Sequence, residues 1–271
     1  MFNTPIINYK NILIKLEYKN PAGSVKDRPA LFMLKEAFLK GYKEIVEVTS
    51  GNTGIALSFY ANKFNIKPTI FMPKSYSVER QKLLRAYGAN LILTNGDIND
   101  AIKEAKEYLK KNNAYFTNQF DNPLNALSHE HSTALEILNQ ADFKTFIASV
   151  GSGGTLMGIA KILKPLGKKI IAVEAKNSPV IYNKIYNKNL PLKPHKIQGI
   201  GAGFIPKNID LNLIDEVILA DENEAIEFMK TLSKKGITGG ISTAANIIAA
   251  KNYKNALTIA PDGIERYLSI L

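Results

Sequence analysis

The 271-residue chain contains no cysteine, which excludes disulfides, a thiolate metal site and a cysteine nucleophile. No apolar run approaches the length of a transmembrane helix, and the start Met1-Phe2-Asn3-Thr4-Pro5 lacks the form of a signal peptide. The chain also lacks internal repeats and low-complexity tracts. We therefore expect a cytoplasmic protein that does not bind a membrane.

Histidine is scarce, because the chain has only His129, His131 and His195. The first two are two residues apart and would point to different faces of a helix, and no carboxylate cluster accompanies the third. We predict no metal site.

Positive charge is in excess, with 35 Lys and Arg against 24 Asp and Glu. The lysines are scattered, as at 103, 106 and 110, and no basic block is interleaved with aromatic residues. We expect no nucleic-acid partner, although a basic surface would attract small anionic substrates.

Apolar strands and amphipathic helices alternate along most of the chain. The strands are expected at 44–48, 69–72, 90–94, 115–117, 145–150, 169–173, 216–220 and 257–260, and the helices at 25–40, 53–64, 78–87, 99–112, 124–138, 155–163, 222–234 and 241–250. This alternation predicts an α/β protein with mainly parallel sheets flanked by helices. A break is expected at the turn 120–123, and the irregular stretch 187–208 is expected to be a site loop.

Residues 15–28 predict a strand, a sharp turn and a helix. Asn20-Pro21-Ala22-Gly23 breaks the strand, Ser24 can cap the helix, and Pro29 is tolerated in its first turn. Lys26 then lies at the helix start, where the helix dipole and Arg28 favour a neutral, nucleophilic amine. On this stretch alone, an ordinary surface lysine is the favoured interpretation.

Two further segments follow predicted strands, where ligands bind in parallel sheets. Thr49-Ser50-Gly51-Asn52-Thr53-Gly54 offers hydroxyls, an amide and helix-end N–H groups to an anion such as an amino-acid carboxylate. Gly151-Ser152-Gly153-Gly154-Thr155 suits a small phosphate ester, and it matches neither the nucleotide P-loop nor the dinucleotide fingerprint. A lysine, a carboxylate cup and a phosphate cup together indicate pyridoxal 5′-phosphate.

The motifs resemble the cysteine synthases (O-acetylserine sulfhydrylases) of the fold-type II pyridoxal-phosphate enzymes, which are tryptophan synthase β-like. The resemblance covers nearly the whole chain and rests on segments 15–17, 20–28, 49–54, 151–155, 196–206 and 265–269, in that order. It implies two α/β lobes: a smaller, mobile lobe of residues 20–122 for the substrate carboxylate, and a larger lobe of residues 1–19 and 123–271 for the cofactor phosphate.

The resemblance also implies the role of each site residue. Lys26 would hold the cofactor as a Schiff base and act as general base, and Asn52 would bond the ring hydroxyl. The carboxylate of the substrate would lie against Thr49, Ser50, Gly51, Thr53 and Gln119; the phosphate would lie against Gly151, Ser152, Gly153, Gly154 and Thr155; and Gly199 would line the substrate mouth.

One position departs from the family pattern. The family has a serine that faces the pyridine nitrogen, whereas this chain has Pro261-Asp262-Gly263. Two interpretations stay open: Asp262 contacts the nitrogen, or it points to solvent or caps a turn.

The activity implied is the replacement of the acetoxy group of O-acetylserine by sulfide to give cysteine and acetate. The resemblance further implies a homodimer, and possible docking of the C-terminal peptide of serine acetyltransferase. Two alternatives remain: a related lyase (cystathionine β-synthase, or serine or threonine dehydratase), and a non-catalytic scaffold that binds such a peptide.

Overall fold

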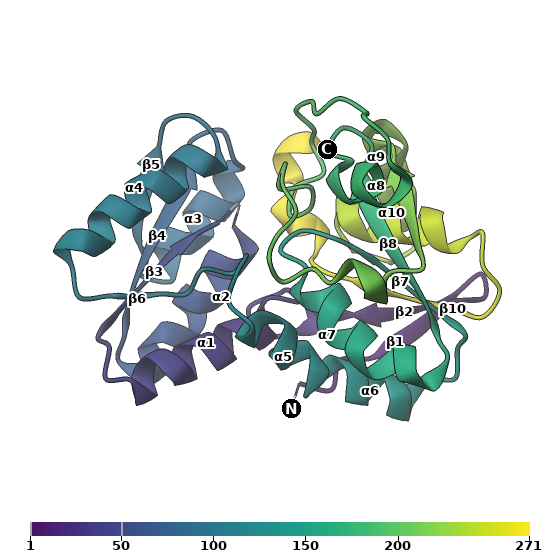
Figure 1. The fold of residues 1–271 in the computed structure, drawn as a ribbon, viewed down its shortest axis with the longest axis horizontal. Coiled ribbons are helices and arrows are strands. Elements are labelled where there is room, and N and C mark those ends of the chain that lie inside the picture. The colour runs from purple at the N-terminus through teal and green to yellow at the C-terminus, as the bar shows by residue number, and fades with distance from the viewer. Residues whose placement is uncertain (1, 50) are drawn as a thin grey trace.

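The computed structural model describes residues 2–49 and 51–271, which form two sheets flanked by helices (Figure 1). The strands are β1 (Ile6–Tyr9), β2 (Ile12–Leu16), β3 (Glu44–Val48), β4 (Lys67–Pro73), β5 (Asn90–Thr94), β6 (Tyr115–Phe116), β7 (Thr145–Ser149), β8 (Lys169–Ala175), β9 (Glu216–Ala220) and β10 (Ala256–Ala260). The α-helices are α1 (Asp27–Leu39), α2 (Asn52–Ala61), α3 (Val78–Ala86), α4 (Ile98–Lys111), α5 (Leu124–Glu130), α6 (Thr133–Gln140), α7 (Gly154–Leu163), α8 (Val180–Tyr186), α9 (Glu222–Ser233) and α10 (Ile241–Ala250).

The smaller sheet has the strand order β5-β4-β3-β6, and all its pairs are parallel. Alternate residues of its strands pack on opposite faces, as the two-residue period of a strand requires. Ile70 and Met72 pack with α2 and α3, whereas Phe71 packs with α4. Helices therefore cover both faces, as expected for a parallel sheet.

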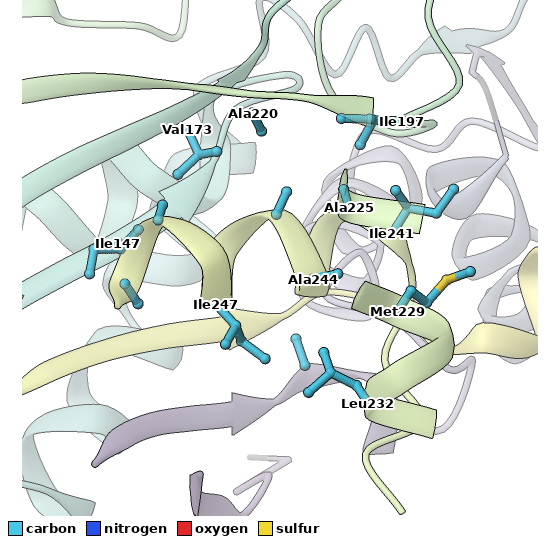
Figure 2. Packing of buried hydrophobic residues seen from close by; sticks show 14 of the residues in the cluster. Ile147, Val173, Ile197, Ala220, Ala225, Met229, Leu232, Ile241, Ala244 and Ile247 are labelled. Atoms are coloured by element: carbon cyan, nitrogen blue, oxygen red, sulfur yellow. The ribbon is translucent and has the colours of Figure 1, made fainter. Parts of the chain in front are cut away.

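The larger sheet has the order β1-β2-β10-β7-β8-β9, in which only the β1–β2 pair is antiparallel. Helices α6 and α7 lie on one face and α9 and α10 on the other (Figure 1). Helix α10 is buried in the core of its layer. Figure 2 shows its Ile241, Ala244 and Ile247 among apolar residues of β7, β8 and α9. The predicted α/β class is confirmed.

A buried ion cluster fixes the start of α1 against α6. Arg28 donates to Glu17 (Nε–Oε2 2.7 Å) and to Glu136 (Nη1–Oε1 2.7 Å), and Lys15 also donates to Glu136 (2.7 Å). All four side chains are at most 5% exposed. The charges of two cations and two carboxylates balance in this cluster. Its Arg28 lies two residues after Lys26.

Within the described residues, no helix is both long and apolar enough to cross a bilayer.

Candidate active site

A cavity of about 550 Å³ lies where the two sheets present the carboxyl ends of their strands. Segments that follow β3, β6, β7 and β10 supply much of its wall, as the rule for ligand sites in parallel sheets predicts. The sequence-predicted residues that line it are Lys26, Thr49, Asn52, Thr53, Gln119, Gly151, Ser152, Gly153, Thr155, Gly199 and Asp262. Gly51 and Gly154 shape the backbone next to it, and Ser50 lies outside the described residues.

Lys26 is the residue that directly precedes α1, and its side chain lines the cavity. The loop before Lys26 pairs with the segment after β10. Val25 N donates to Pro261 O at 2.7 Å, and Ser24 forms an isolated antiparallel β-bridge with Asp262. Burial lowers the pKa of Lys26 to about 8, and the charge of Asp262 opposes this shift. The neutral, nucleophilic amine of Lys26 therefore becomes the main form above about pH 8, well below the pH that an ordinary lysine needs.

Two sequence-based details of this segment are wrong. Ser24 does not cap α1 through N2 or N3, because its hydroxyl accepts from the N–H of Lys26 (3.2 Å). Arg28 is not among the causes of the lowered pKa of Lys26, and its guanidinium is held by Glu17 and Glu136 instead. Pro29 does lie in the first turn, as predicted.

The turn between β3 and α2 forms the wall on the side of the smaller sheet. Thr49 Oγ1 accepts from Gly51 N (3.0 Å), and the first N–H groups of α2 have no partner within the helix. Gly51 has φ +142°, and a Cβ there would lie 2.4 Å from Arg80 Cδ. Only glycine fits this position.

Hydrogen bonds fix both the amide oxygen and the amide nitrogen of the Gln119 side chain. Its Oε1 accepts from Thr53 Oγ1 (2.6 Å), and its Nε2 donates to Glu47 Oε1 (3.3 Å) and Val48 O (3.2 Å). Glu47 is 1% exposed, and burial raises its pKa to about 7 against hydrogen bonds from Thr117, Val48 and Gln119. A ligand carboxylate that takes an amide hydrogen of Gln119 must displace one of these bonds.

The segment 151–155 forms a cup at the start of α7. Gly153 has φ +86°, and a Cβ there would lie 2.3 Å from Ile209 Cδ1. A Cβ on Gly151 would lie 2.2 Å from Gly199 O, so the loop containing Gly199 packs directly against the cup. The free N–H groups of the α7 start suit a phosphate.

Helix α5 supports the cup with two side chains one turn apart that sequence reasoning missed as site residues. Asn125 Nδ2 donates to Ser152 Oγ (2.8 Å), and His129 Nε2 lies 3.3 Å from Thr155 Oγ1. Burial holds the pKa of His129 well below its ordinary value, so the ring is neutral. The i, i+4 spacing of 125 and 129 was the only signal in the sequence.

Asp262 does not point to solvent, because it is 1% exposed. Its Oδ2 accepts from Asn52 Nδ2 (2.7 Å), Tyr267 Oη (2.8 Å) and Arg80 Nη2 (3.3 Å). Ser242, on the first turn of α10, lines the same cavity and was also missed. Among the residues described, no group of His, Asp and Glu could hold a metal ion.

These groups fit pyridoxal phosphate, because a reactive amine, a phosphate cup and an amide line one cavity. Comparison with known proteins agrees: the family described as pyridoxal-phosphate dependent enzyme matches residues 1–271. The chain belongs to this family. The predicted cofactor and enzyme class are thereby confirmed.

Individual proteins of this pyridoxal-phosphate family are similar to the chain over nearly its whole length. Cysteine synthase of Buchnera aphidicola is 44% identical over 98% of this chain and 92% of its own length. The crystal structure of a cysteine synthase from Entamoeba histolytica superposes with a TM-score of 0.88 at 37% identity, covering 98% of this chain and 86% of that one. An O-acetylserine-dependent cystathionine β-synthase from Helicobacter pylori superposes at 0.89 and 36%, covering 98% and 94%. The resemblance to cysteine synthases is confirmed.

Proposed function

We propose that the protein is a cysteine synthase, which replaces the acetoxy group of O-acetyl-L-serine by sulfide to give L-cysteine and acetate. The observation that carries the proposal is one cavity that combines the amine of Lys26, the phosphate cup and the carboxylate-side turn of Thr49. The 44% identity to a cysteine synthase over nearly the whole chain supports the same activity.

The residues that would hold the cofactor come from both sheets. Lys26 would bind its aldehyde carbon, Asn52 would donate to its ring oxygen, and Gly151, Ser152, Gly153, Gly154 and Thr155 would surround its phosphate. The bound cofactor supplies an electron sink for the electrons left when the α-proton of the substrate is removed.

Lys26 is the group that moves this proton. With a pKa of about 8, its amine can be neutral when it accepts the proton from the α-carbon and can return it later. Acetate leaves with the electron pair of the C–O bond, hydrosulfide forms the C–S bond at the β-carbon, and Lys26 gives the proton back to the α-carbon.

The substrate carboxylate would bind at the turn between β3 and α2. Thr49, Gly51 and Thr53 supply hydroxyl and backbone donors there, and Gln119 would exchange its bond to Glu47 or Val48 for the ligand. Ser50 stays a prediction for this subsite. Gly199 would line the mouth opposite.

The proposal extends to the organisation of the molecule. The smaller lobe would comprise residues 20–122, which contain β3–β6, and the larger would comprise 1–19 and 123–271, which contain the other sheet. Closure of the smaller lobe over the carboxylate would exclude water from the reacting atoms. We further propose a cytoplasmic homodimer, with the C-terminal peptide of serine acetyltransferase as a candidate ligand of the cavity.

The test is a comparison of products from the purified protein loaded with pyridoxal phosphate. O-acetylserine with sulfide should yield cysteine, and Lys26→Ala should abolish this turnover. Failure of the wild type to bind the cofactor, or near-normal turnover by the variant, would refute the proposal.

A related lyase activity is the second candidate, because one similar structure is named an O-acetylserine-dependent cystathionine β-synthase. Homocysteine in place of sulfide, and serine or threonine alone, distinguish the alternatives. Cystathionine as the preferred product, or release of a keto acid, would replace the cysteine synthase assignment.

A further inference from the structure

One carboxylate oxygen joins the two sheets of the molecule. Asp262, which follows β10, receives three hydrogen bonds on Oδ2: from Asn52 at the start of α2, from Arg80 of α3, and from Tyr267. The side chains of Arg80 and Tyr267 are fully buried. Two of the three donors therefore belong to the layer of the smaller sheet, while the acceptor and Tyr267 belong to the segment that follows the larger sheet.

The amide of Asn52 has one possible orientation in this setting. Asp262 Oδ2 is the acceptor of this bond, so the group of Asn52 next to it is the NH₂. On its other side, Arg266 Nη1 donates to Asn52 Oδ1 (3.5 Å), and a guanidinium can only donate. One amide hydrogen of Asn52 bonds Asp262, and the second stays available to a ligand in the cavity that Asn52 lines.

The other carboxylate oxygen of Asp262, Oδ1, lies close to Gly240. A Cβ on Gly240 would lie 2.3 Å from Asp262 Oδ1, and Gly240 N donates to Asp262 O (2.9 Å). Oδ1 is buried and has no hydrogen-bond partner among the described residues. Of the two carboxylate oxygens, Oδ2 is thus the one that hydrogen bonds from the described residues hold.

We propose that Asp262 is a positioning residue that aims the free amide hydrogen of Asn52 at the ring oxygen of the cofactor. This inference rests on the proposed function, in which Asn52 bonds that oxygen. Asp262 then acts on the cofactor through Asn52. Since Asn52 and Asp262 belong to different layers, this bond also sets the position of the smaller sheet relative to the cofactor.

Substitutions that keep or remove the acceptor oxygen separate the two roles. Asp262→Asn retains a carbonyl oxygen that can accept from Asn52, with its NH₂ turned toward Gly240. Asp262→Ala removes the acceptor. We expect Asp262→Ala to weaken cofactor binding roughly tenfold, the size expected of one hydrogen bond, and to shift the visible absorption band. Asp262→Asn should restore both to nearly the wild-type values.

A double-substitution cycle tests whether Asp262 acts through Asn52. The dissociation constant of pyridoxal phosphate is measured for Asn52→Ala, Asp262→Ala and the double variant. We expect all three to bind about equally weakly. The proposal would be overturned if the loss of affinity in the double variant were the product of the two single losses. It would also be overturned if Asp262→Asn weakened cofactor binding as much as Asp262→Ala does.

Two controls keep the outcome decisive. Glu79→Ala removes a contact between α3 and Ser269, in which Glu79 Oε1 accepts from the Ser269 N–H (2.8 Å); this contact does not involve Asn52, and the substitution should leave the spectrum unchanged. If Asp262→Ala does not fold because the charge of Arg80 loses this partner, the cycle is run with Arg80→Met in every variant. If the wild type takes up no pyridoxal phosphate, the proposed function fails; if it does, the cycle judges this inference alone.

Discussion

Asn125 offers a sharp test of how the phosphate cup works. Its Nδ2 donates to Gln119 O and to Ser152 Oγ, both at 2.8 Å. Because Ser152 Oγ accepts this bond, its own hydrogen is turned away from Asn125 and can point to a phosphate oxygen. Asn125→Ala removes that orientation and leaves Ser152 itself in place.

The chain supplies a matched control in Asn208. Its Nδ2 donates to the same Gln119 O (2.7 Å) and to the backbone oxygen of Ser152 (3.4 Å), so it does not touch the hydroxyl. Asn125→Ala and Asn208→Ala should lower the free energy of unfolding by similar amounts, about 1–2 kcal/mol for their lost hydrogen bonds. Only Asn125→Ala should weaken cofactor binding, by about 1 kcal/mol or roughly fivefold.

The measurement is a titration of each apoprotein with pyridoxal phosphate, followed by absorbance, beside urea unfolding of the same samples. On a Ser152→Ala background, Asn125→Ala should have no further effect on affinity. Equal losses of affinity for the two asparagine variants would show that α5 supports the cup only as scaffolding.

Three further outcomes are expected. The hydrogen bonds of Arg28 and Lys15 outweigh burial and hold the pKa of Glu136 at about 2, below its ordinary value. Its stabilisation is therefore present at neutral pH and is lost as pH falls from about 4.5 through about 2, and Glu136→Gln should flatten that part of an acid-unfolding curve. Gly158→Ala should destabilise by about 1–2 kcal/mol in urea unfolding, although alanine favours helices, because its Cβ would lie 2.1 Å from Ala126 O. The rate at which borohydride fixes pyridoxal phosphate onto the apoprotein should rise with pH through about 8, because only neutral Lys26 reacts; a rate independent of pH would contradict the pKa.

The fold could be predicted where the apolar residues of a segment follow a single period, that of a strand or that of a helix. The strand at 44–48 and the helix at 241–250 agree with β3 and α10 to the residue, because both are bounded by turn residues and buried along their length. The helix expected over 124–138 is divided into α5 and α6 at His131 and Ser132. Strand β1 and helix α8 were missed, because each is short and carries no strong periodicity.

The site was predictable where residues adjacent in sequence act together. Turns 49–54 and 151–155 follow strands whose ends meet in space, and both contribute to the cavity. Glu47, Asn125 and His129 could not be assigned, because each contacts its functional neighbour only after distant segments pack. Asn125, for instance, lies 27 positions from Ser152.

The pairing of β2 with β10 has a consequence for biosynthesis. Residues 12–16 lie beside residues 256–260 in the middle of the larger sheet, so β2 leaves the ribosome long before its partner exists. At ordinary rates of translation the wait is roughly 10–50 s, far longer than a hairpin needs to form. Meanwhile the smaller sheet, whose strands are contiguous in the chain, can complete itself. The β1–β2 hairpin is therefore an unpaired edge during synthesis, and it is the segment of the nascent chain that we expect chaperones to bind.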